Sequence, residues 1–208
     1  MSHNSSTPIP GFGWLCIAML AFSIAAYAIV QIGVPAMRSP FAGSLVSLRP
    51  VPALLHFLGG GLALAIGALQ INRKLRMRSV SVHRWLGRLY VLAVILGGTA
   101  GLALAVHAFG GAVSIVGFGL LGVLWLSTTL IGYWHIRNKN TLAHRAWMLR
   151  SYSLTLAAVT LRIYVPLTEM LAIPFEVAYP AIAWLAWVPN LLVAELFLRA
   201  RPAVGLNG

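Results

Sequence analysis

Acidic residues and cysteines are the two residue classes that this chain almost lacks. Of its 208 residues only three are Asp or Glu and one is Cys, whereas 15 are Lys or Arg, so the formal charge is +12. A single cysteine, Cys16, excludes an intramolecular disulfide and a cysteine metal cluster. The shortage of carboxylates argues against a typical hydrolytic zinc site. The sequence also has no nucleotide-binding glycine loop and no catalytic-triad motif.

Apolar sequence is what the chain has in abundance. Hydrophobic residues make up 60% of it and charged residues 9%, and the mean hydropathy is +0.87, far from the composition of a soluble domain. Apolar runs of about membrane-crossing length recur, which predicts an all-α polytopic membrane protein. Because the basic residues lie in short connections between these runs, we expect the lipid bilayer and its anionic headgroups as partners, and no nucleic acid.

Six membrane spans are predicted, in a single domain of residues 14–198 between a polar tail, 1–13, and a second tail, 199–208. The spans are residues 14–36, 52–71, 85–106, 113–135, 147–171 and 179–198. The first tail has no Lys or Arg, so we expect a retained helix after it rather than a signal peptide. Basic residues concentrate in the connections after spans two and four and in the last tail, and only Arg38 and Arg49 lie opposite. The positive-inside rule therefore predicts cytoplasmic termini.

Two of these spans begin with the same pattern. Residues 81–90 read SVHRWLGRLY and residues 143–152 read AHRAWMLRSY. His83 and Arg84 recur as His144 and Arg145. A tryptophan, an arginine and a tyrosine recur one register later, as Trp85, Arg88 and Tyr90 in the first copy and Trp147, Arg150 and Tyr152 in the second. We therefore expect His83 and His144 at matching depth on the cytoplasmic side.

The histidines leave three interpretations open. Two imidazoles from neighbouring helices can supply both axial ligands of a b-type haem, which is the hypothesis for His83 and His144. Together with His135 the same pair could instead form a site for Zn, Cu or Fe. The third interpretation is that these residues, like His56 and His107 near the outer ends of spans two and three, are histidines that tolerate the membrane interface.

Four arginines accompany the repeated histidines. Arg84, Arg88, Arg145 and Arg150 are predicted in first helical turns, where free backbone N–H groups attract anions. Two such helix ends together would form a basic pocket for haem propionates, a phosphate headgroup or an anionic substrate. The alternative is simple anchoring on lipid phosphates.

One further arginine is predicted well inside the fifth span. An unpaired guanidinium at such a depth costs at least a few kcal/mol, so Arg162 needs partners. The candidates are Glu169, two helical turns further on, and Asn190 or Glu195 on span six. The pattern is consistent with a structural ion pair and equally with a quinone or substrate site in the outer half.

Small residues recur at helical spacing in spans two and three. Such positions allow helix backbones to approach closely, or leave room for a flat cofactor. They are Gly59, Ala63, Gly67, Gly97 and Gly101.

The repeated motif resembles a bacterial membrane-protein family catalogued as domain of unknown function 2306. HRWLGR at 83–88 and HRAWMLRSY at 144–152 support the resemblance, as do HFLGG from His56, AVTLR at 158–162 and WVPNLLVAE at 187–195. The similar region covers about residues 52–199. The resemblance implies a multi-span protein of the bacterial plasma membrane without an established activity.

A second likeness implies a mechanism. HRWLG at 83–87 is similar to the HSWLG element of the ascorbate-reducible transmembrane b cytochromes, which hold two haems on histidines of four successive helices. This likeness implies His83 and His144 as ligands of a cytoplasmic-side haem b and His56 as one ligand of an outer haem. The chain departs from that pattern on span four, because His135 lies at the opposite end from His56, and only His107 could take its place.

Two functions are therefore predicted as alternatives. One is a haem-binding membrane electron-transfer subunit, which needs an external redox partner or a quinone. The other is a small-molecule or lipid transporter, or an accessory membrane subunit, organised around Arg162.

Overall fold

The computed structural model describes residues 11–200 and confirms an all-helical chain, with no β-strand in that region. The predicted tail residues 1–10 and 201–208 lie outside the described part, and residues 11–13 already belong to the first helix. The helices are α1 Gly11–Gly33, a 3-10 turn η1 Pro35–Met37, α2 Pro40–Leu48, α3 Pro50–Gln70, α4 Arg73–Arg78, α5 Val80–Ala105, α6 Gly111–Arg137, α7 Thr141–Thr155, α8 Ala157–Met170, α9 Phe175–Leu185 and α10 Val188–Arg199.

Five stretches of the described chain are long and apolar enough to cross a membrane. They are Phe12–Gly33, Pro50–Gln70, Val80–Ala105, Gly111–Arg137 and Phe175–Arg199. These correspond to the predicted spans one to four and six. Residues 147–171, the predicted fifth span, are not among them, because Arg150, Arg162 and the hydroxyl-rich sequence SYSLT at 151–155 lower the hydropathy of this segment.

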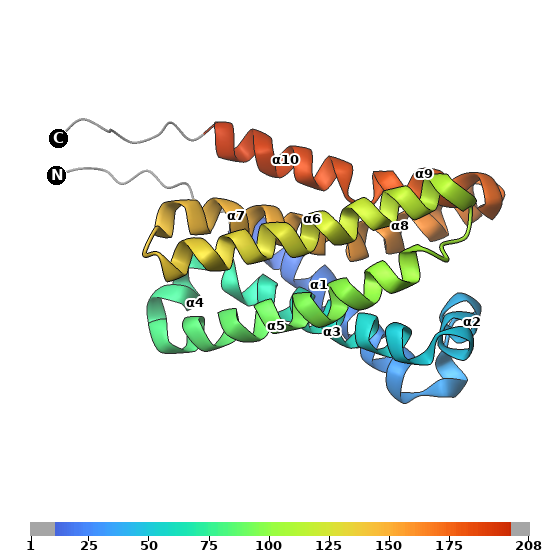
Figure 1. The fold of residues 1–208 in the computed structure, drawn as a ribbon, viewed down its shortest axis with the longest axis horizontal. Helices are drawn as coiled ribbons and strands as arrows, with labels where there is room; N and C mark the ends of the chain where they lie inside the picture. The colour runs from blue at the N-terminus through green and yellow to red at the C-terminus, as the bar shows by residue number, and fades with distance from the viewer. Residues whose placement is uncertain (1–10, 201–208) are drawn as a thin grey trace.

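Residues 147–171, the predicted fifth span, are nevertheless helical almost throughout. Only Leu156 separates α7 from α8, and the helical hydrogen bonds continue across it, from Leu156 N to Tyr152 O (3.0 Å) and from Thr160 N to Leu156 O (3.1 Å). Figure 1 shows α7 and α8 following one another along the length of the molecule. α7 packs against α6, and α8 packs against α9 and α1.

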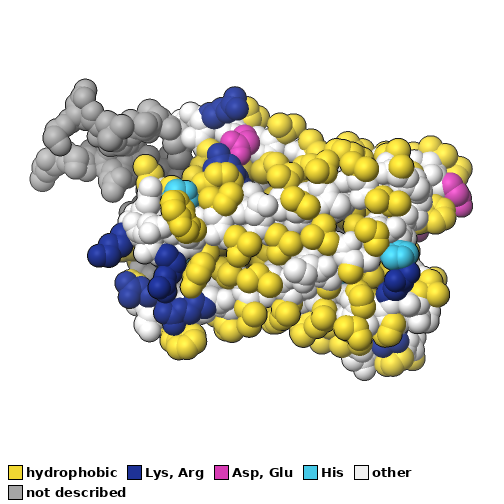
Figure 2. Space-filling view, viewed as in Figure 1, with side chains coloured by type: hydrophobic (Ala, Val, Ile, Leu, Met, Phe, Trp, Pro, Cys, Tyr) yellow, Lys and Arg dark blue, Asp and Glu magenta, His cyan; other side chains and the backbone are white. Residues whose placement is uncertain are grey.

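The helices lie side by side along one axis, so the molecule has two distinct ends (Figure 1). One end holds α4, the α6–α7 turn and the last residues of α10. We call it the basic end, because Lys and Arg side chains gather there (Figure 2). The opposite, or far, end holds α2 and the connections α5–α6 and α8–α9.

Small residues bring α3 and α5 into direct backbone contact. A Cβ placed on Gly59 would lie only 2.5 Å from the backbone nitrogen of Gly97, and one placed on Gly97 would lie 2.9 Å from that of Gly60. Close packing, rather than a cofactor, therefore occupies these predicted small-residue positions. α1 packs on the other side of α3, so α3 lies at the centre of the first half of the chain.

Aromatic rings pack together at the far end. The ring centroid of Tyr179 on α9 lies 4.8 Å from that of Phe175, 5.5 Å from that of Phe118 and 5.8 Å from that of Phe41 on α2. Phe109 in the α5–α6 connection packs on Phe175 at 5.3 Å. These rings tie α2, α6 and α9 together over that end of the bundle.

Candidate functional site

The two repeated histidines occupy equivalent positions at the basic end. His83 lies in the first turn of α5 and His144 in the first turn of α7. The residues before these helices, Ser79 and Asn140, cap them, and their side chains accept hydrogen bonds of 3.3 and 3.0 Å from backbone N–H groups of the first turn.

The two imidazoles are held by different neighbours. Nδ1 of His144 lies 2.8 Å from the carbonyl oxygen of Gly132 on α6. Because a carbonyl only accepts, Nδ1 carries the proton and Nε2 is left with its lone pair. His83 lies beside Gln70 of α3, whose Nε2 donates to the His83 carbonyl oxygen at 2.9 Å. The imidazoles of His83 and His144 are within electrostatic range of each other.

Burial is the main influence on His144 and lowers its pKa below the usual 6.5. The hydrogen bond to Gly132 opposes this shift, and the charges of Arg145 and His135 lower the pKa further. His144 is therefore neutral at pH 7, in the protonation state that a metal ligand or a hydrogen-bond acceptor requires.

The predicted three-histidine metal site is not assembled. Within residues 11–200, no group of three His, Cys, Asp or Glu side chains is placed to hold a metal ion. His135 packs against its neighbour Trp134, with ring centroids 4.9 Å apart in an edge-on arrangement. It influences His144 only through space, as a nearby charge.

One of the two predicted haem ligands, His83, lines a cavity at the basic end. The cavity beside His83 has a volume of about 400 Å³, and its walls come from α3, α4 and α5, so His144 does not line it. Further along the helices, seven residues after His83 and eight after His144, Tyr90 and Tyr152 fill the space next to α3. A Cβ added to Gly67 would collide with the ring of Tyr152 and lie 3.2 Å from that of Tyr90.

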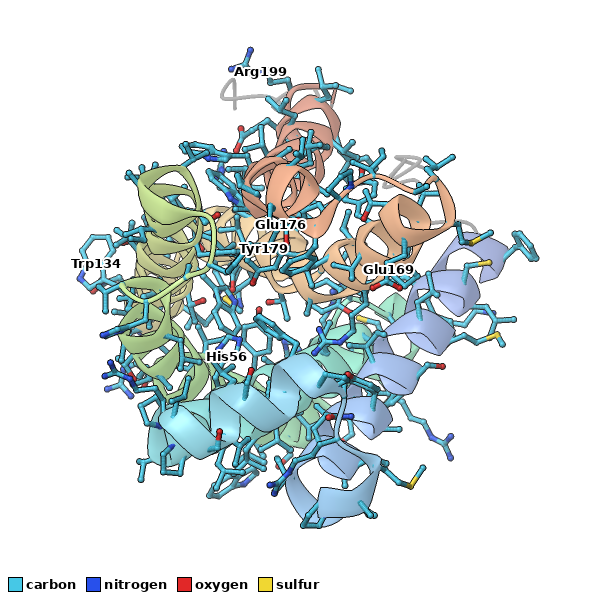
Figure 3. The ribbon with its side chains drawn as sticks, turned by 90° about the vertical axis from the view of Figure 1, so that its right-hand side faces the viewer. His56, Trp134, Glu169, Glu176, Tyr179 and Arg199 are labelled. Atoms are coloured by element: carbon cyan, nitrogen blue, oxygen red, sulfur yellow. The ribbon has the colours of Figure 1, made fainter. Side chains whose placement is uncertain are left out.

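The two outer histidines have different surroundings. His56 points into the bundle at the far end (Figure 3), and its Nδ1 lies 2.9 Å from the carbonyl oxygen of Gly97 on α5. His107 is exposed at the same end and lines a separate surface cavity of about 330 Å³ with Arg49 and two leucines of α2.

The repeated arginines and tryptophans form equivalent pairs. The guanidinium carbon of Arg88 lies 5.0 Å from the ring centroid of Trp85, and that of Arg150 lies 4.7 Å from that of Trp147. Arg150 also binds Glu195 of α10 through two hydrogen bonds, of 2.5 and 3.0 Å. Both pairs are structural contacts, and they occupy two of the four arginines that were expected to form one anion pocket. The other two, Arg84 and Arg145, are exposed.

None of the predicted partners contacts Arg162. Glu195 is bound to Arg150, whereas Asn190 donates to Thr160 Oγ1 at 2.9 Å. Glu169 is exposed on the last turn of α8 at the far end (Figure 3) and forms no ion pair with Arg162. The prediction of these partners was wrong, because each polar group of α10 finds a nearer partner on α7 or α8.

Arg162 instead contacts its own helix and α1. Its Nη1 donates to the Ala158 carbonyl oxygen at 3.0 Å, and its guanidinium carbon lies 5.0 Å from the ring centroid of Tyr27. The side chain is partly buried and is within electrostatic range of His56. Arg162 and His56 both lie in the far half of the bundle.

Sequence reasoning missed a buried hydroxyl network between α5, α6 and α7. The Tyr90 hydroxyl lies 2.8 Å from both Ser151 Oγ and Thr155 Oγ1. Trp125 Nε1 donates to Thr155 Oγ1 at 2.9 Å, and the Thr129 hydroxyl lies 2.6 Å from Ser151 Oγ. The signal was in the sequence as the run SYSLT at 151–155, with two hydroxyls one helical turn apart facing the tyrosine of the other copy.

Comparison with known proteins places the chain in one family and gives no activity. The model of a family described as predicted membrane protein (DUF2306) matches residues 53–198. No curated protein and no solved structure matches the chain.

Proposed function

The chain belongs to the DUF2306 family of predicted membrane proteins, and from this premise we propose that it is a six-span protein of the bacterial plasma membrane with cytoplasmic termini. We propose further that it binds a membrane-soluble small molecule at Arg162 and His56, in the manner of a transporter or an accessory membrane subunit. The observation that carries the proposal is a partly buried arginine without a carboxylate partner in the described chain.

The topology rests on the joined helix α7–α8 and on the charges. α7 packs along α6 and α8 reaches the far end, as a sixth span would. Basic residues of α4, α5, α6 and α7 lie at the basic end, which the positive-inside rule assigns to the cytoplasm. In a Cys16→Ser background, Ile173→Cys in the α8–α9 connection should react with an impermeant maleimide in intact spheroplasts, and Lys74→Cys only after lysis. Labelling of both in intact spheroplasts would contradict this topology.

Arg162 needs a counter-group that residues 11–200 do not supply. Its carbonyl and aromatic contacts leave most of its N–H donors to other acceptors. The Tyr27 ring, 37% exposed, lies on the surface between α1 and α8, so a ligand can approach Arg162 from the side of the bilayer. An intramembrane charge of this kind commonly marks a ligand site.

His56 supplies a hydrogen-bond acceptor, whereas Arg162 supplies donors. Because its Nδ1 faces a carbonyl oxygen, Nδ1 carries the proton and the neutral ring offers Nε2 as an acceptor. Arg162 then offers donors to a carbonyl or carboxylate oxygen, and His56 accepts from a hydroxyl. In its quinol form a quinone–quinol head has two hydroxyls on one ring, so one can accept from Arg162 while the other donates to His56. An ionised fatty acid has acceptors only, and we therefore infer the quinone–quinol class of ligand.

Photolabelling in lipid nanodiscs tests the proposal. An azidoquinone and a diazirine fatty acid are photolysed separately with the protein, and the labelled peptides are identified by mass spectrometry. We expect azidoquinone on α1, α3 or α8, a reduction of about tenfold in Arg162→Gln, and no change in Arg49→Gln, an exposed arginine at the same end. Equal labelling of wild type and Arg162→Gln would refute the proposal, and preferential fatty-acid labelling would change the ligand class.

A haem-binding electron-transfer subunit is the competing function. It is favoured by the hydrogen bond of His144 Nδ1, which leaves Nε2 for an axial bond. It is opposed by the cavity beside His83, which His144 does not line. A reducible Soret band that disappears in His83→Ala would support it. Colourless protein that is labelled by the azidoquinone would support the Arg162 proposal.

A further inference from the structure

A cavity of about 400 Å³ opens at the basic end, where α3 ends and α5 begins. This volume is within the range of small-molecule sites, about 300–1,000 Å³. Its polar wall consists of Gln70, Arg76, Arg78, Ser79 and His83, and its apolar wall of Leu69, Val82 and Leu86. No acidic side chain lines it, so the cavity carries a positive potential.

One atom of this wall is unsatisfied. Gln70 Nε2 donates to the His83 carbonyl oxygen, which fixes the orientation of the amide because that oxygen can only accept. Gln70 Oε1 is then buried without a hydrogen-bond partner in the described chain. A buried acceptor left in this state is costly, so the cavity is suited to a ligand that donates a hydrogen bond.

The apolar wall places the cavity at the surface of the bilayer. Val82 is 55% exposed and the nearby Trp85 is 61% exposed, and tryptophan is typical of the level of the lipid headgroups. A ligand there meets two arginines, one unpaired acceptor and an apolar slope that leads into the membrane.

We propose that this cavity binds the headgroup of an anionic phospholipid that carries free hydroxyls, of the phosphatidylglycerol type. The phosphate binds Arg76 and Arg78, a headgroup hydroxyl donates to Gln70 Oε1, and an acyl chain follows Val82 into the bilayer. This site lies at the opposite end from Arg162, and its test does not depend on the proposed function.

Two lipids of equal charge separate the hydroxyl contact from charge alone. Phosphatidylglycerol and phosphatidylethanol are both anionic phosphodiesters, but only the first has headgroup hydroxyls. Native mass spectrometry of the full chain, titrated with each lipid in turn, gives the two dissociation constants. We expect wild-type protein to bind phosphatidylglycerol about fivefold more tightly, the effect of one net hydrogen bond. Equal binding of the two lipids by wild type overturns the proposal whatever the variants do.

Two variants assign the contacts. Gln70→Leu should abolish the preference between the two lipids and keep anionic lipid ahead of phosphatidylcholine. Arg78→Gln should weaken both anionic lipids about fivefold, whereas Arg137→Gln, an exposed arginine at the same end outside the cavity, should change neither. Equal losses in the two arginine variants would show general surface attraction and overturn the site.

A soluble phosphate compound is the alternative ligand for this cavity. Adding sn-glycerol 1-phosphate or inorganic phosphate to the titration should leave the lipid affinity unchanged, because neither has an acyl chain for the apolar wall. Displacement of the lipid by either at millimolar concentration would overturn the assignment to a lipid.

Discussion

Tyr90→Phe is the substitution that most directly tests the packing of α5 against α7. It removes a single hydroxyl oxygen from a side chain that is 2% exposed and keeps the ring in place. That oxygen lies 2.8 Å from each of two hydroxyls on α7, those of Ser151 and Thr155. The change therefore deletes two side-chain hydrogen bonds between α5 and α7.

The expected cost is small, because the two partners keep other hydrogen bonds. Ser151 Oγ retains Thr129 at 2.6 Å, and Thr155 Oγ1 retains the Trp125 donor at 2.9 Å. A side-chain hydrogen bond between membrane helices contributes about 0.6 kcal/mol on average and one in a soluble core about 0.5–1.5 kcal/mol. Loss of two should lower the free energy of unfolding by about 1–2 kcal/mol.

Thermal unfolding in dodecylmaltoside measures this cost. For a chain of this size, 1 kcal/mol corresponds to a shift of about 2–4 °C in Tm, so Tyr90→Phe should lower Tm by about 2–8 °C. The control is Tyr133→Phe on α6, because the Tyr133 hydroxyl makes no hydrogen bond within residues 11–200. A Tm for Tyr90→Phe equal to that of the control would mean that the network does not hold α5 to α7.

Three further predictions test separate contacts. Gly67→Ala places a Cβ against a buried tyrosine ring and should cost about 1–3 kcal/mol, whereas Gly60→Ala, with nothing within 4 Å, should leave Tm unchanged. Arg150→Gln and Glu195→Gln should each lower stability by about 1 kcal/mol or less, and a double-mutant cycle should show that the two losses are not additive. Because His144 has a lowered pKa in the folded state, its contribution to stability is present above the unfolded pKa of 6.5 and is lost as the pH falls below it. Tm should therefore decrease between pH 7.5 and 5.5, and less so in His144→Asn.

Helix positions and the ends of the bundle could be predicted from the sequence because hydropathy and charge report them directly. The matching positions of His83 and His144 could also be predicted from the sequence, because each copy of the motif lies at the start of a helix, just after its capping residue. What the repeat could not show was the direction of each side chain. His83 and His144 share a motif, yet one lies beside α3 and the other is bonded to α6, because their neighbours in the fold are not repeated.

The partners of Arg162 were mispredicted for a similar reason. Spacing along one helix made Glu169 a candidate, and Asn190 and Glu195 were candidates as polar residues of span six. The competition for those groups was not visible in the sequence. Glu195 is bound by two hydrogen bonds from Arg150 of α7, and Asn190 donates to Thr160 of α8. Both contacts depend on how α10 lies against α7 and α8.

The hydroxyl network also explains why the hydropathy of α7–α8 is low for a membrane span. A hydropathy scale counts each serine, threonine and tyrosine as an exposed polar group that must lose water on entering lipid. In the folded chain Ser151 and Thr155 are 0% and 4% exposed, and each is hydrogen-bonded. Their transfer cost is therefore offset inside the bundle, by partners on α5 and α6 that hydropathy cannot count. If α7–α8 is the further membrane span proposed above, it needs those partners to be stable in a bilayer, and the two copies of the motif then depend on each other for their place in the membrane.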